Sequence, residues 1–146
     1  MATFSRRAEL QWNGGVMDGE GRIRAGTAAF DVGATFPSTL GERPGTTTPE
    51  EMLAASHAIC YGIGLRSLIG RRGGTARTVT VTATITADKG PAGILIRSSH
   101  LDATIAGLER IDEQQLAEIA RAVEADCTIS VALRGNVAIT STVTAI

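Results

Sequence analysis

The feature that most constrains the fold is an apolar segment that begins after Thr48. Thr48, Pro49 and Glu51 together are typical of a helix start, with Thr48 as the N-cap, Pro49 at the first helical position and Glu51 completing a capping box. The residues that follow, to about position 69, are apolar nearly all round, and such a helix must be enclosed by protein on most sides. We therefore expect a central helix over residues 49–69.

Several residues of this helix are small, which would let another backbone approach it closely. They are Ala54, Ala55, Ser56, Ala58, Gly62 and Gly64. Each glycine costs about 1 kcal/mol of helix propensity relative to alanine, and packing must offset that cost. The pattern favours a second helix packed alongside the first.

The residues before this helix are predicted to form short strands. Residues 6–12 alternate between apolar and polar side chains, residues 13–15 (Asn-Gly-Gly) indicate a turn, and two further β segments follow at 22–25 and 28–34. We expect a small β-meander. Residues 37–47 are rich in glycine and proline and should form the loop into the helix.

The residues after the helix are predicted to form a β-hairpin. Residues 77–87 alternate strictly between threonine and apolar side chains, which is typical of a strand with one buried face and one face in water. Residues 88–93 contain two glycines and a proline and lead into a second strand over 94–106. The hairpin should therefore have a long loop.

A second helix and a closing strand complete the predicted architecture. Asp112 and Gln115 form a cap before an amphipathic helix, and Cys127 lies at the end of this helix. Residues 137–145 alternate again and should join the sheet. Strands mixed with two helices, without a regular βαβ repeat, indicate an α+β fold. The apolar face of the helix consists of Leu116, Ile119, Ala120 and Val123.

Length and charge limit the function classes. The 146 residues fit one domain over residues 1–146, and the net charge of −1 leaves no charge footprint for nucleic acid or an anionic membrane surface. The N-terminal residues have no apolar signal-peptide region, and the apolar runs elsewhere are shorter than a membrane span. We expect a cytoplasmic protein that binds neither nucleic acid nor membrane.

The chain has two cysteines, Cys60 in the first helix and Cys127 after the second. Isolated thiols on separate elements act together only if the fold joins them, as in a peroxidatic and resolving pair. In the cytoplasm a disulfide between them would be a transient catalytic state. The alternative is that both are inert core residues. The cysteines and the two histidines have no ligand spacing, so we expect no metal and no cofactor.

The residues around the first cysteine resemble a known family. Residues 48–60, Thr-Pro-Glu-Glu-Met-Leu-Ala-Ala-Ser-His-Ala-Ile-Cys, are similar to the cysteine-helix signature of the OsmC/Ohr family, the osmotically inducible protein C and organic hydroperoxide resistance proteins. His57 places the chain closer to the OsmC branch, since the Ohr branch usually has tyrosine there. The order of predicted elements resembles the family along the whole chain. The resemblance implies an intertwined α+β homodimer with active sites at the subunit interface.

The resemblance also implies a reaction and roles for residues. Cys60 would attack a hydroperoxide and become a sulfenic acid, and Cys127 would resolve it as a Cys60–Cys127 disulfide. The substrate would be an organic hydroperoxide or hydrogen peroxide, in oxidative or osmotic stress. A dithiol, such as a lipoyl protein, would reduce the disulfide. Glu50 would orient an arginine that activates the Cys60 thiolate.

Helix geometry limits how Glu50 can act. Ten residues of helix rise about 15 Å, so Glu50 cannot touch Cys60 of its own chain if the helix is continuous. Contact requires the partner subunit or a break in the helix.

The activating arginine is the point at which the chain departs from the family. Thr35 stands where the OsmC branch usually has an arginine. A cation is needed because a free cysteine, with a pKa of about 8.5, is mostly a thiol at neutral pH. Arg43, on the loop before the helix, is the first candidate and should pair with Glu50. Arg22 and Arg24 are the other candidates.

Two function classes therefore stay open. The first is the thiol-dependent peroxidase. The second is a non-enzymatic OsmC-like dimer that binds a small apolar ligand at the subunit interface, and Thr35 keeps this alternative open. For His57, one turn before Cys60, we favour a core histidine with satisfied hydrogen bonds over a group that borders the thiolate.

Overall fold

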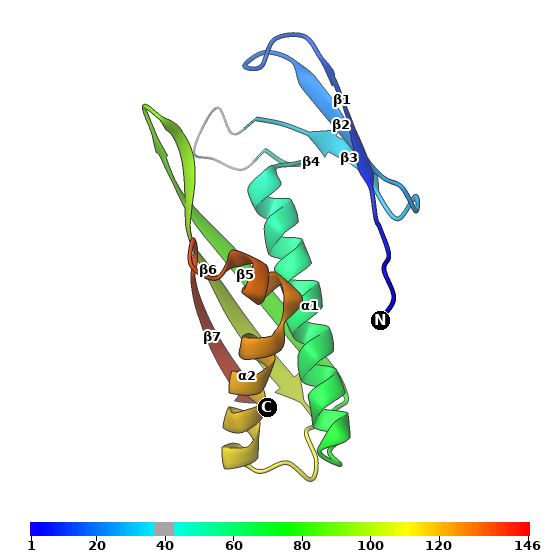
Figure 1. The fold of residues 1–146 in the computed structure, drawn as a ribbon, viewed down its shortest axis with the longest axis vertical. Coiled ribbons are helices and arrows are strands. Elements are labelled where there is room, and N and C mark those ends of the chain that lie inside the picture. The colour runs from blue at the N-terminus through cyan, green and yellow to red at the C-terminus, as the bar shows by residue number, and fades with distance from the viewer. Residues whose placement is uncertain (37–42) are drawn as a thin grey trace. The chain divides into compact units, whose positions relative to one another are not determined.

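The computed structural model describes residues 1–36 and 43–146 and divides the chain into two compact units, Met1–Glu51 and Met52–Ile146 (Figure 1). Each unit is described by itself. The assignment of residues 1–146 to one domain stays a prediction. Part of the predicted loop over 37–47, residues 37–42, lies outside the described residues.

The first unit is a small sheet. Its described strands, in the order β1–β2–β3–β4, are β1 (Ala8–Asn13), β2 (Glu20–Ala25), β3 (Asp31–Ala34) and β4 (Thr46–Thr47). The first three strands pair antiparallel, so the predicted meander is confirmed. The two-residue strand β4 adds a parallel pair with β3 and was not predicted, because two residues are too few for an alternating pattern to show.

The second unit contains a three-stranded sheet and three helices. They are α1 (Pro49–Arg71), whose first turn begins in the first unit, β5 (Thr78–Gly90), β6 (Gly93–Ala106), α2 (Glu113–Asp126), α3 (Thr128–Leu133) and β7 (Ala138–Ala145). The sheet order is β5–β6–β7. β5 pairs antiparallel with β6, and β7 pairs parallel with β6, so α2 and α3 form the crossover of a βαβ unit. The hairpin and the closing strand are confirmed.

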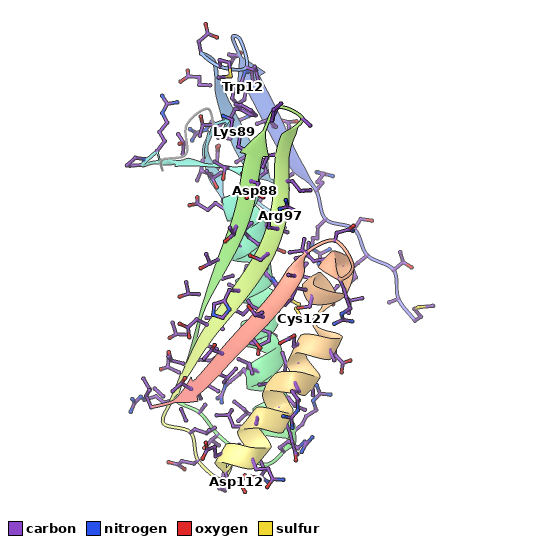
Figure 2. The ribbon with its side chains drawn as sticks, turned by 90° about the vertical axis from the view of Figure 1, so that its left-hand side faces the viewer. Trp12, Asp88, Lys89, Arg97, Asp112 and Cys127 are labelled. Atoms are coloured by element: carbon purple, nitrogen blue, oxygen red, sulfur yellow. The ribbon has the colours of Figure 1, made fainter. Side chains whose placement is uncertain are left out.

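The hairpin loop is shorter than the sequence analysis predicted. Gly90 pairs with Gly93, which leaves only Pro91 and Ala92 in the turn. Gly93 has φ +117°, a conformation that other residues rarely adopt, and this explains how so short a turn can form. Close to the turn, Arg97 Nε donates to Asp88 Oδ2 at 2.6 Å across the two strands (Figure 2).

The core of the second unit lies between the sheet and the helices α1 and α2, which cover the same face of it (Figures 1 and 2). The start of α2 has the predicted capping box, because Asp112 Oδ1 accepts from the Gln115 N–H at 2.8 Å and Gln115 Oε1 accepts from the Asp112 N–H at 2.9 Å. Burial of the apolar side chains in this core is the main stabilising contribution to the second unit. The core residues are Tyr61, Leu65, Ile69, Ala76, Leu101, Ala103, Ile105, Leu116, Ile119 and Val123.

Helix α1 begins as predicted but is less enclosed than predicted. Thr48 Oγ1 accepts from the Glu51 N–H at 3.3 Å, as expected for an N-cap. One stripe of the helix is buried, whereas Ile59 and Ile63 are 62% and 66% exposed. The described residues of the second unit therefore leave these two apolar side chains of α1 uncovered.

By length and composition alone, α1 is also long and apolar enough to cross a membrane, which the sequence analysis did not expect. This is a weak indication, because core helices of soluble proteins pass the same test. Here the buried stripe of α1 packs into the core cluster of the sheet.

Helices α1 and α2 approach each other closely at Gly64, as the small residues of α1 predicted. A Cβ added at Gly64 would lie 2.7 Å from Val123 Cγ1, whereas one added at Gly70 would meet nothing within 4 Å. The valine side chain has a stiff χ1 angle in a helix and cannot easily turn aside.

We predict that Gly64→Ala lowers the free energy of unfolding and that Gly70→Ala raises it by up to about 1 kcal/mol. At Gly64, overpacking costs about 1–3 kcal/mol and outweighs the gain in helix propensity. Denaturant unfolding of both variants checks this prediction. An equal gain in stability for both variants would show that α1 and α2 are not in close contact at this point.

Candidate active site at the two cysteines

Cys60 and Cys127 are brought together by the fold of the second unit. Cys60 is half-buried in the middle of α1, and Cys127 is only 6% exposed at the junction of α2 and α3 (Figure 2). Both are free thiols, and their side chains are within hydrogen-bonding reach of each other. The structure thus joins the two thiols that the sequence left on separate elements.

The backbone around Cys127 fixes its position. Cys127 leaves the helical conformation, with φ −56° and ψ 121°, and ends α2. Its N–H donates to the Val123 carbonyl at 2.8 Å, and its carbonyl accepts from the Val131 N–H at 2.9 Å. The short helix predicted after Cys127 is confirmed as α3, and the cysteine is therefore held from both sides.

The two thiols differ in acidity because their surroundings differ. Burial raises the pKa of Cys60, and its hydrogen bond to Cys127 raises it further, against a smaller opposing effect of the Ile129 N–H. Burial also opposes ionisation of Cys127, but hydrogen bonds from Cys60, from the N–H and hydroxyl of Ser130 and from the Ile129 N–H lower its pKa overall. Within the single chain Cys127 is therefore the more acidic of the two thiols.

This order of acidity is the reverse of the one that favours attack by Cys60. None of the influences on the Cys60 pKa from the described part of the chain comes from an arginine or lysine. If Cys60 is the attacking thiolate, a cation from another source must lower its pKa.

His57 is a buried histidine with both ring nitrogens hydrogen-bonded. Its side chain is 0% exposed, with Nδ1 2.7 Å from Ser99 Oγ and Nε2 2.8 Å from Ser130 Oγ. Burial lowers the pKa of His57, and the charge of Glu124 only partly opposes this, so the ring is neutral at physiological pH. The interpretation of His57 as a satisfied core histidine is confirmed.

The sequence analysis did not identify the two serines that hold His57. Ser99 lies on the same face of β6 as Leu101 and Ala103, so a polar residue in a run of core positions was the available signal. Ser130 follows Cys127 by three residues, and nothing in the sequence distinguishes it from a surface serine.

A second buried polar group lies beside this site. Tyr61 is 0% exposed and its hydroxyl has no hydrogen-bond partner of good geometry among the described residues. Burial raises the pKa of Tyr61, and the hydroxyl of Ser141 opposes this shift from nearby while itself donating to Glu124 Oε2 at 2.6 Å. The charge of the Glu124 carboxylate thus raises the pKa of both His57 and Tyr61.

The predicted cation candidates belong to the first unit. Arg43 Nη1 donates to Thr35 Oγ1 at 3.5 Å, so the loop arginine lies beside the position at which the OsmC branch has its arginine. Arg22 and Arg24 both pair with Asp31, at 2.6 Å and 3.3 Å. The described residues contain no ion pair between Arg43 and Glu50, so this predicted pairing stays a prediction.

Glu50 lies in the first turn of α1, and α1 runs without a break from Pro49 to Arg71. Of the two routes by which Glu50 could reach Cys60, a break in the helix is therefore excluded, and the route through a partner subunit is left.

In the part of the chain that the structure describes, no group of three His, Cys, Asp or Glu side chains could hold a metal ion.

Comparisons with known proteins identify the family. Residues 41–142 match the family described as OsmC-like protein. Peroxiredoxin OsmC of Escherichia coli K12 is 26% identical over 135 residues, which cover 92% of this chain and 94% of that protein.

Solved structures show the same fold. An organic hydroperoxide resistance protein OsmC from Legionella pneumophila superposes with a TM-score of 0.76 at 20% identity and full coverage of both chains. The organic hydroperoxide resistance protein OhrB of Bacillus subtilis gives 0.70 at 22% identity, over 94% of this chain and 97% of that one. The expected α+β fold is therefore confirmed, and this chain belongs to the OsmC-like protein family.

Proposed function

We propose that this protein is a cysteine-based peroxidase that reduces organic hydroperoxides, and also hydrogen peroxide, in the cytoplasm under oxidative or osmotic stress. The observation that carries the proposal is the pairing of Cys60 and Cys127, two free thiols within hydrogen-bonding reach on separate elements. The names of the relatives, a peroxiredoxin and hydroperoxide resistance proteins, support the same chemistry.

The reaction uses the two sulfurs in turn. The Cys60 thiolate attacks one oxygen of the O–O bond, the bond breaks, and the alkoxide leaves and takes up a proton as the alcohol. Cys60 is then a sulfenic acid. The Cys127 thiolate attacks its sulfur, hydroxide leaves and is protonated to water, and a disulfide results. An external dithiol, such as a lipoyl protein, supplies two electrons and two protons to restore both thiols.

A homodimer completes this site in our proposal. Cys60 lies on α1 between Ile59 and Ile63, which are large apolar residues with exposed side chains. A second copy of the chain would cover this face and could bring Glu50 and Arg43 to Cys60, which the continuous helix prevents within one chain. The contact of Arg43 with Thr35 supports Arg43 as the cation, because it lies at the position that the family's arginine would take.

The second candidate function is a dimer that binds a small apolar ligand at the subunit interface without turnover. The raised pKa of Cys60 in the single chain and the threonine at position 35 favour it. In that case Ile59 and Ile63 would contact the ligand.

We predict that the protein consumes cumene hydroperoxide with dithiothreitol as reductant, and that Cys60→Ser reduces consumption to background. Cys127→Ser should keep the first oxidation but accumulate sulfenic acid or over-oxidised Cys60. Peroxide assays with both cumene hydroperoxide and hydrogen peroxide, followed by intact mass, check this. Loss of the first oxidation in Cys127→Ser alone would reverse the two roles, and no turnover of either peroxide would favour the binding protein.

We predict a stable dimer at micromolar concentration, because an exposed apolar face on α1 is unfavourable in water. Ile63→Glu should dissociate it, since the carboxylate would be buried without a partner. Ala117→Glu, on the exposed side of α2, is the matched control. Sedimentation of all three proteins measures the outcome, and a folded wild-type monomer would rule out the proposed dimer site.

We predict that Arg43→Ala raises the pKa of Cys60 and slows peroxide reduction, because a nearby positive charge stabilises the thiolate. The pH dependence of iodoacetamide alkylation, measured in a Cys127→Ser background, reports this pKa. Arg22→Ala and Arg24→Ala are the controls, since both arginines already pair with Asp31. An unchanged profile in Arg43→Ala would exclude Arg43 as the activator, and a wild-type pKa of about 8.5 would indicate that Cys60 has no activator.

A further inference from the structure

A buried network of hydrogen bonds links the sheet to Cys127. Ser99 on β6 contacts His57 Nδ1 at 2.7 Å, and His57 Nε2 contacts Ser130 Oγ on α3 at 2.8 Å. The Ser130 hydroxyl in turn lies near enough to the Cys127 sulfur to lower the pKa of this thiol by hydrogen bonding. Ser99, His57 and Ser130 are 0% exposed and Cys127 is 6% exposed, so bulk water is excluded from these contacts.

Counting protons links the directions of the hydrogen bonds in this network, so that one direction determines the others. A serine hydroxyl has one proton to donate, and a neutral imidazole has one N–H. If the Ser130 hydroxyl donates to the Cys127 thiolate, its oxygen must accept from the ring, so Nε2 carries the ring proton. Nδ1 is then an acceptor, and the Ser99 hydroxyl must donate to it.

We propose that His57 is a positioning residue for the second half of the reaction: as its Nε2–H tautomer, it holds the Ser130 hydroxyl as a donor to the Cys127 sulfur. The tautomer follows from the contacts of His57 together with donation by the Ser130 hydroxyl to Cys127, whereas the role in disulfide formation rests on the proposed peroxidase function. His57 touches neither peroxide nor Cys60 sulfur in this role and acts only through Ser130.

This role explains why three hydrogen-bonded polar residues, Ser99, His57 and Ser130, are buried in an otherwise apolar core. A charge-assisted hydrogen bond from a hydroxyl stabilises the Cys127 thiolate, which must attack the Cys60 sulfenic acid. Without the ring N–H, the Ser130 hydroxyl could rotate away and donate elsewhere. Attack by Cys127 would slow, whereas the first oxidation at Cys60 would continue.

The tautomer can be tested without any peroxide. In the reduced protein labelled with ¹⁵N-histidine, long-range ¹H–¹⁵N correlation spectra should show the Nε2–H form for His57, with His100→Gln used to assign the two rings. In Cys127→Ala, which removes the acceptor at the end of the network, the preference for Nε2–H should weaken. A Nδ1–H ring or a charged imidazolium in the reduced wild-type protein would overturn the proposal.

The role can be tested by separating the two steps after one equivalent of cumene hydroperoxide. In Ser130→Ala and His57→Leu, dimedone-trapped sulfenic acid should appear no more slowly than in the wild-type protein, while disulfide formation should slow by about tenfold or more, as expected for a lost charge-assisted hydrogen bond. His57→Gln, whose amide can place a donor near the Nε2 position, should recover part of the rate.

The outcomes distinguish this proposal from the function on which it rests. A folded Ser130→Ala protein that forms the disulfide at the wild-type rate would overturn the positioning role. If the wild-type protein forms no sulfenic acid, the peroxidase proposal fails and with it the role in disulfide formation, while the spectra still decide the tautomer. Where His57→Leu does not fold, the wild-type spectra and Ser130→Ala remain decisive.

Discussion

The close approach of α1 and α2 at Gly64 and Val123 determines where the two thiols lie. α1 and α2 run in opposite directions (Figure 1). The position one turn before Gly64 on α1 therefore lies level with the position one turn after Val123 on α2. Cys60 occupies the first of these positions and Cys127 the second. A Cβ at residue 64 would lie 2.7 Å from Val123 Cγ1, so the tightest contact between these helices lies one turn from each of the two thiols.

The same packing brings polar groups into the core, which has a consequence for acidity. At the junction of α2 and α3, hydrogen bonds outweigh the effect of burial on the pKa of Cys127, whereas burial and the hydrogen bond to Cys127 outweigh the backbone N–H groups of Thr128 and Ile129 at Cys60. The pKa of Cys60 is therefore raised and that of Cys127 lowered, although the two side chains are chemically identical. Among the described residues no arginine or lysine contributes to the pKa of Cys60, and its neighbours Ile59 and Ile63 on α1 are exposed.

The elements with a strong local signal could be predicted from the sequence. Strict alternation over residues 77–87 and the Asp112 capping box both predicted elements that the structure contains. The direction of β7 could not be predicted, because alternation is the same in a parallel and an antiparallel strand. The meeting of the cysteines followed only from the family resemblance. Ser99 and Ser130 are 42 and 73 residues from His57, and no local pattern reports hydrogen bonds over such separations.

The difference in exposure between the two cysteines has a consequence for regeneration. In a Cys60–Cys127 disulfide, the buried Cys127 sulfur would be shielded by the α2–α3 junction, and the incoming dithiol would reach only the Cys60 sulfur. Exchange is faster when the displaced sulfur is the more acidic one, and Cys127 has the lowered pKa. Reduction would then have a fixed polarity, with the mixed disulfide always formed on α1 and Cys127 always released first.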